Sequence, residues 1–175
     1  MFLECTKKLA DALKIKLFNI TPLRREPFYE WHANLFIFNR RKGMIMMNNQ
    51  TRYCVVLYGL KAEHFKDIRH IALSAIEQIF LAEGFAKEAV GRYMNHCGDI
   101  VIGKTHDRSV ISQMNDMLYL TSSWIEHYLP ANDICLADLS MKLGGVPVGS
   151  LKYTFPIDHL REAMSSEILS GKSCT

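Results

Sequence analysis

Residues 31–58 carry a pattern typical of three consecutive β-strands. The apolar segments WHANLFIF, MIMM and YCVVLY are separated by the polar segments NRRKG and NNQT. In the first segment Ala33 and Leu35 point to one side and Phe36 and Phe38 to the other, so both faces are expected to be covered. Short polar connections favour antiparallel neighbours. We therefore predict an antiparallel β-meander over residues 31–58.

Two longer stretches, residues 64–83 and 107–129, repeat apolar residues every three or four positions. The stripe of the first is Phe65, Ile68, Ala72, Ala75, Ile76, Ile79 and Phe80. The stripe of the second is Val110, Ile111, Met114, Met117, Leu118, Thr121, Trp124 and Tyr128. This spacing indicates amphipathic helices with one apolar face. The predicted fold class is α+β, with the two helices covering the meander.

Shorter patterns predict strands near residues 1–5, 99–102 and 150–155, and helices at 7–15, at 86–96 and from Pro156 onward. No internal repeat or linker divides the chain, and 175 residues suffice for one hydrophobic core. We expect a single globular domain over residues 1–175, with a frayed tail at 170–175.

Charge is unevenly distributed along an otherwise ordinary globular composition. The net charge is only +3, but residues 1–60 contain ten Lys or Arg against four Asp or Glu, so they carry +6 and the remainder −3. Such asymmetry is found where a basic face meets nucleic acid or an acidic protein, and also in domains whose two halves interleave in space.

The five cysteines are widely spaced and include no CxxC pair, so they indicate neither a disulfide framework nor a zinc motif. The N-terminus has charged residues where a secretory signal needs an apolar core, and no apolar run is long enough to cross a membrane. We expect a cytoplasmic protein without a membrane partner.

The first candidate site is the turn that contains Arg40, Arg41 and Lys42. Cations at an exposed hairpin tip can contact phosphates without being buried, but they also keep a sheet soluble and block edge pairing. His32, in the strand before this turn, has a pKa range suited to a general base, although a histidine in a strand is more often structural.

The second candidate site is GKTHDRS, residues 103–109, at a predicted junction between a strand and a helix. Lys104 and Arg108 could bind an anion beside the free N–H groups of the helix N-terminus. Thr105 or Asp107 could equally cap the helix. The glycines of a P-loop are absent, and the seven histidines form no HxH or HExxH pattern, so we expect no cofactor and no metal.

The two candidate sites could form one ribonuclease-like site if folding brings them together. The histidines His32 and His106 would exchange protons without a metal. The cations Arg40, Lys104 and Arg108 would stabilise the developing negative charge. Nothing in their spacing requires this proximity, so it stays a hypothesis that the structure must decide.

Several segments resemble an uncharacterised bacterial domain family: CTKKLADALKI, WHANLFIFNRRK, RYCVVLYGLKAEHF, AEGF and KTHDRS. The resemblance covers residues 1–120 well and the remainder loosely. Members of that family occur alone or ahead of a plasmid-ORF-3-like domain associated with mobile elements. The resemblance implies a bacterial or phage setting and carries no established activity, cofactor or catalytic residue.

Our leading functional hypothesis is a non-enzymatic interaction module that binds nucleic acid or a protein partner, in mobile-element or phage biology. Its candidate contact residues are Arg40, Arg41, Lys42, Lys104 and Arg108. The first alternative is the small metal-independent ribonuclease-like enzyme that uses His32, His106 and Lys104. The second alternative is a homodimeric accessory protein.

Overall fold

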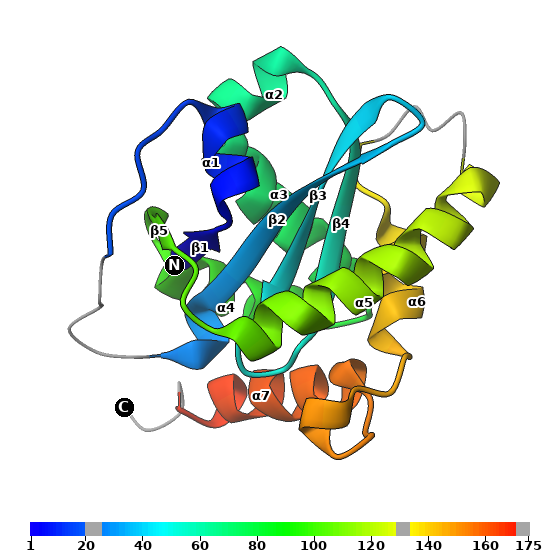
Figure 1. Cartoon of the computed structure of the whole chain (residues 1–175). Helices are drawn as coiled ribbons and strands as arrows, with labels where there is room; N and C mark the ends of the chain where they lie inside the picture. Colours follow the sequence, from blue (N-terminus) through cyan, green and yellow to red (C-terminus); the bar gives the residue numbers. More distant parts are fainter. Residues whose placement is uncertain (20–25, 129–133, 171–175) are drawn as a thin grey trace.

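A computed structural model describes residues 1–19, 26–128 and 134–170. Its centre is a five-stranded sheet in the order β4-β3-β2-β1-β5, with helices against both faces (Figure 1). The predicted α+β class is confirmed.

The predicted meander is present as β2 (Glu30–Phe38), β3 (Arg41–Asn48) and β4 (Cys54–Leu60). Both pairings are antiparallel, and the β3–β4 register shifts at Lys42 and Gly43. The β2–β3 turn is tight because Asn39 and Arg40 have φ values of 44° and 60°. Positive φ at both central residues is the geometry that suits the twist of a two-residue hairpin.

The sheet is mixed, because two further strands join the meander in parallel. β1 (Phe2–Cys5) lies between β2 and β5 (Val101–Lys104) and pairs in parallel with both. The antiparallel pattern expected from the meander therefore holds only for β2 to β4. Parallel pairing requires long crossover connections, and the turn signals near residues 31–58 carry no information about it.

One face of the sheet packs against α1 (Lys7–Leu13), α3 (Ile68–Ala82), α4 (Lys87–Cys97) and α7 (Pro156–Ser170). The helix predicted for 64–83 is interrupted at Asp67, whose φ of −120° and ψ of 33° separate α3 from the short α2 (Ala62–Lys66). The side chains of odd-numbered β2 residues, such as the fully buried Trp31, point into this core.

The other face packs against α5 (Arg108–Trp124) and α6 (Ala137–Gly144). The 3₁₀ turn η2 (Ile125–Tyr128) continues α5, so the predicted helix at 107–129 is present to Tyr128, and residue 129 lies outside the described part. In Figure 1 α5 crosses the strands with its N-terminal end near β5. The even-numbered β2 residues, including His32 and Phe36, point toward this face.

The strand expected at residues 150–155 is wrong. Gly149–Leu151 form the 3₁₀ turn η3, and Lys152 and Tyr153 have positive φ values that end any extended run. α6 was not predicted, because Asn132 to Leu143 show little periodicity. In the described residues no helix is both long and apolar enough to span a bilayer, and most of the predicted frayed tail, residues 171–175, lies outside them.

Candidate functional site

Glu4 brings a carboxylate into the interior of the sheet. It lies on the central strand β1, where it is the Cα partner of His32 on one side and of Gly103 on the other. Its side chain is fully buried. A buried carboxylate is strongly destabilising unless polar groups surround it, so the neighbours of Glu4 are expected to be hydrogen-bonding residues.

His32 is the first of these neighbours and is itself fully buried. Its Nε2 atom lies 3.3 Å from Oε2 of Glu4, and its Nδ1 atom lies 2.7 Å from Oδ1 of Asn49. The parallel register of β1 and β2 creates this contact, because it places Glu4 and His32 side by side on the same face of the sheet.

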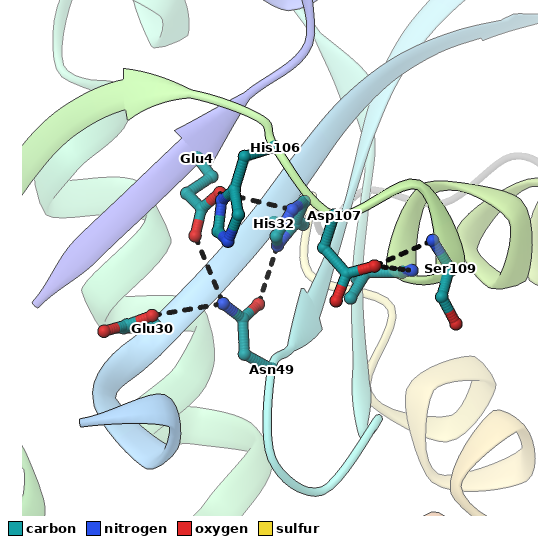
Figure 2. A network of polar contacts seen from close by, with 8 residues as sticks. Glu4, Glu30, His32, Asn49, His106, Asp107 and Ser109 are labelled. Carbon is teal, nitrogen blue, oxygen red and sulfur yellow. Dashed lines mark hydrogen bonds and ion pairs between the residues drawn. The ribbon is translucent and has the colours of Figure 1, made fainter. Parts of the chain in front are cut away.

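His106 completes the cluster from the segment between β5 and α5. Its Nδ1 atom hydrogen-bonds to Oε2 of Glu4, and its ring centroid lies 5.8 Å from that of His32 (Figure 2). The His106 side chain is 51% exposed. The fold thus brings together the two histidines of the ribonuclease-like hypothesis, with the carboxylate of Glu4 beside both.

Asn49, in the β3–β4 turn, determines which nitrogen of His32 carries a proton. The Asn49 amide nitrogen donates to Glu4 Oε1 at 3.2 Å and to Glu30 Oε2 at 3.4 Å, so its oxygen faces His32. An oxygen can only accept, and His32 Nδ1 must therefore be the N–H donor of this pair. The lone pair of neutral His32 is then on Nε2, the atom that faces Glu4.

Burial lowers the pKa of His32. The loss of hydration outweighs the opposing influence of the Glu4 charge and the Asn49 hydrogen bond. His32 Nε2 has no hydrogen-bond partner among the described residues, although Oε2 of Glu4 lies 3.3 Å away. The cluster therefore contains a buried imidazole nitrogen that has no hydrogen-bond partner among the described residues and lies 3.3 Å from a carboxylate oxygen.

Asp107 follows His106 in the chain and caps the N-terminus of α5. Its Oδ1 atom accepts hydrogen bonds from the backbone N–H groups of Ser109 at 2.8 Å and Val110 at 3.3 Å, as a helix N-cap does. Burial alone would raise the pKa of Asp107, but these hydrogen bonds and the charge of Arg52 lower it. The capping alternative for residues 103–109 is confirmed, with Asp107 as the cap.

The cations of the second candidate site do not join the cluster. Lys104 is the Cα partner of Cys5, one position along from the pair of Gly103 and Glu4, so alternation directs it to the opposite face of the sheet from His32. Arg108 is exposed at the first position of α5. The ribonuclease-like hypothesis therefore retains its histidine pair but loses Lys104.

Arg40, Arg41 and Lys42 lie at the other end of β2. Phe38 pairs with Arg41, six residues beyond His32, which corresponds to about 20 Å along a strand. The three cations line a cleft of about 710 Å³ together with the end of β4, the start of α2 and Ile134. The lining residues are Arg40, Arg41, Lys42, Tyr58, Gly59, Leu60, Lys61, Ala62, His64 and Ile134. These lining residues include four Lys or Arg side chains and no carboxylate.

Aromatic groups hold the cleft in shape. Tyr58 Oη donates to the Phe38 carbonyl at 2.9 Å, which ties the end of β2 to β4. Lys42 Nζ lies 5.4 Å from the centroid of the Phe65 ring, a cation–π distance that leaves the ammonium group at the cleft.

Sequence reasoning did not identify Glu4, Glu30 or Asn49. The expectation of no metal site came from linear motifs, whereas Glu4, His32 and His106 are separated by 28 and 74 residues. The available signal was an acidic residue within the apolar strand FLEC, together with His32 on a largely apolar strand.

A family model for a domain of unknown function, DUF6933, matches residues 2–159. This chain belongs to that family. The match confirms the resemblance to an uncharacterised domain family and contains all the residues of the cluster and of the cleft. No curated protein and no solved structure matched the chain.

Proposed function

We infer that this protein is an interaction module that binds the phosphate backbone of a nucleic acid in the cleft at the β2–β3 hairpin tip. The observation that carries this proposal is the composition of the cleft: among its described lining residues Arg40, Arg41, Lys42 and Lys61 are cationic, and none is a carboxylate. Exposed cations attract phosphates and release the counterions that surround them.

Backbone geometry at the turn gives independent support. Arg40 has a φ of 60°, a left-handed conformation in which glycine is favoured at the second position of an Asn-Gly turn. A non-glycine residue there is destabilising by about 1 kcal/mol. An arginine in this conformation is consistent with selection for its charge at the cost of turn stability.

The ribonuclease-like alternative has less support. His32 is fully buried, so a substrate hydroxyl could not reach it without displacing its neighbours. Lys104 is directed to the other face of the sheet. His106 and Lys104 are both exposed, but they lie on opposite faces of the sheet, and His32 is buried.

The test is fluorescence anisotropy with labelled single-stranded RNA, single-stranded DNA and duplex DNA over a range of salt concentrations. The triple variant Arg40→Ala, Arg41→Ala, Lys42→Ala should lose at least about tenfold in affinity at low salt. The slope of log Kd against log salt should fall by about 2 to 3, since each phosphate contact contributes about one.

A matched control removes the same charge elsewhere. Lys7, Lys8 and Lys87 are exposed outside the cleft, and their triple alanine variant should bind within about twofold of wild type. If both triple variants lose the same affinity, the loss comes from the lower net charge, and the cleft is not the binding site. Absence of binding to all three nucleic acids at low salt would overturn the proposal.

A protein partner for the same cleft, a homodimer and a mobile-element setting stay predictions. An acidic peptide is the appropriate second probe in the same titration. If the peptide binds and nucleic acid does not, the cleft is a site for a protein partner and the nucleic-acid proposal is rejected.

A further inference from the structure

Glu4, His32 and His106 each direct a metal-ligating atom to one small region. One carboxylate oxygen and two imidazole nitrogens all lie within 4.8 Å of one another (Figure 2). Oε2 of Glu4 is the central atom, since it lies 3.3 Å from Nε2 of His32 and also contacts Nδ1 of His106. The three residues come from β1, β2 and the β5–α5 connection.

The buried Nε2 atom of His32 has no hydrogen-bond partner among the described residues. On the other side of the ring Nδ1 donates to Oδ1 of Asn49, and Nε2 itself lies 3.3 Å from Oε2 of Glu4. A buried polar atom without a partner is rare in folded proteins and calls for an explanation, such as an ion. A metal cation beside Nε2 and Oε2 would bond to both atoms.

The spacing of these atoms fits coordination. Two ligands bound at about 2.1 Å in a tetrahedral arrangement lie about 3.4 Å apart. The 3.3 Å between Glu4 Oε2 and His32 Nε2 matches this distance. His106 is half-exposed, so its ring can turn from its hydrogen bond with Glu4 to a metal, and solvent can reach the same side.

The neighbours of the cluster hold the ligands in place. Asn49 accepts from His32 Nδ1–H and donates to Glu4, which orients one imidazole and one carboxylate together. Glu30, held by the backbone N–H of Glu26 at 3.1 Å, accepts from the same Asn49 amide. Metal-binding histidines typically donate their second ring N–H to such an oxygen, which fixes the tautomer and the ring orientation.

We propose that Glu4, His32 and His106 bind one divalent first-row transition-metal cation, such as Zn²⁺ or Fe²⁺. Two imidazoles and one carboxylate suit these ions better than Mg²⁺ or Ca²⁺, which prefer oxygen ligands. Three protein ligands leave a coordination position open on the side of the exposed His106, where water or a small substrate group can bind. The site lies at the opposite end of β2 from the cleft and includes none of its residues, so this proposal goes beyond nucleic-acid binding.

The test uses tag-free protein that has been stripped with a chelator and then titrated with Zn²⁺ or Co²⁺. Calorimetry should give one ion per chain, and Co²⁺ should produce visible absorption bands of a coordinated ion. Mg²⁺ should not compete. His106→Ala, a change at a half-exposed residue that should preserve folding, should weaken binding by at least about tenfold. Glu4→Gln should do the same, because it keeps the shape of the side chain and removes its charge.

The matched control is His96→Ala. His96 is 50% exposed and its Nε2 lies 2.8 Å from Oε2 of Glu26, so it forms a histidine–glutamate pair like that of His106. Among the described residues, only Glu4, His32 and His106 form a three-ligand group, and loss of His96 should leave affinity and stoichiometry unchanged. Absence of Zn²⁺ and Co²⁺ binding to wild type, equal binding by His106→Ala, or equal competition by Mg²⁺ would overturn the proposal.

Discussion

The two ends of the β2–β3 hairpin place charge in opposite environments. At the His32 end, charged and polar side chains are buried and contact one another across β1, β2 and the β3–β4 turn. At the tip, Arg40, Arg41 and Lys42 are on the surface and line a cleft whose described lining residues include no carboxylate. The same pair of strands thus has a buried, pre-organised cluster at one end and an exposed cationic cleft at the other.

This difference determines what each end can recognise. A buried cluster excludes large ligands and fixes the direction of its lone pairs, which suits a small cation. An exposed cationic cleft fixes little geometry but attracts a polyanion over a longer range, with a strong dependence on salt. The four substitution and labelling predictions below test this contrast, from the largest expected effect to the smallest.

Asn49→Ala should have the largest effect on stability. It removes hydrogen bonds to His32, Glu4 and Glu30, of which the two carboxylates are buried. We expect a loss of about 2–4 kcal/mol in the free energy of unfolding, measured by urea denaturation. Gln50→Ala, at the exposed neighbouring position, should change it by less than about 0.5 kcal/mol. Similar values for both variants would show that the cluster end is not specially organised.

Gly43→Ala tests the packing of β3 between the His32 end and the tip of the hairpin. A Cβ atom at Gly43 would lie 2.2 Å from Cζ of Phe36, whose ring covers this glycine across the strand pair. Displacing a buried ring should destabilise the protein by about 1–3 kcal/mol.

Gly91→Ala is the matched control with the opposite sign. Gly91 is inside α4 and a Cβ atom there would meet nothing within 4 Å, so alanine should stabilise the helix by about 0.5–1 kcal/mol. Thermal unfolding of both variants checks the pair. Stabilisation by Gly43→Ala would contradict the packing of Phe36.

Arg40→Gly separates backbone strain from charge at the tip. Glycine adopts the φ of 60° without steric penalty, so stability should rise by a few tenths to about 1 kcal/mol. Nucleic-acid affinity should fall in the same variant, because one cation of the cleft is lost. A variant that is more stable and binds equally well would remove the argument that Arg40 is retained for its charge.

The smallest expected effect is the labelling of the Cys54 thiol in the native protein, because Cys54 is buried near the cluster. It pairs with Met47, which also pairs with His32, and burial raises the pKa of its thiol to about 12. The reactive thiolate is therefore scarce below that pH. Iodoacetamide at pH 8 should label the Cys54 peptide only after denaturation, as measured by mass spectrometry. Rapid labelling in native buffer would show that this end of the hairpin opens to solvent.

The meander and the cationic turn are predictable from sequence because both depend on neighbours in the chain. Alternation in β2 and the polar segments around Arg40 and Asn49 are local patterns, and they identify the strands correctly. The helical stripes at 64–83 and 107–129 are equally local. Their main error is the interruption at Asp67, where the backbone leaves the helical conformation although the apolar pattern continues.

The cluster could not be predicted in the same way. It requires the parallel register that sets Glu4 beside His32, and no turn or periodicity encodes this pairing. It also requires β5 to bring His106 to the same edge. Register between distant strands is determined by the packing of the whole sheet, so residues that are far apart in sequence, such as Glu4 and His32, form one site.

One measurement tests directly whether the two ends of the hairpin bind different ligands. It is a ¹H–¹⁵N correlation spectrum of the wild-type protein, titrated first with Zn²⁺ and then with a short oligonucleotide. Zn²⁺ should shift the resonances of Glu4, His32 and His106 and leave Arg40, Arg41 and Lys42 unchanged. The oligonucleotide should shift the second group and leave the first unchanged. An oligonucleotide that moves the cluster resonances while the tip stays unperturbed would contradict the account.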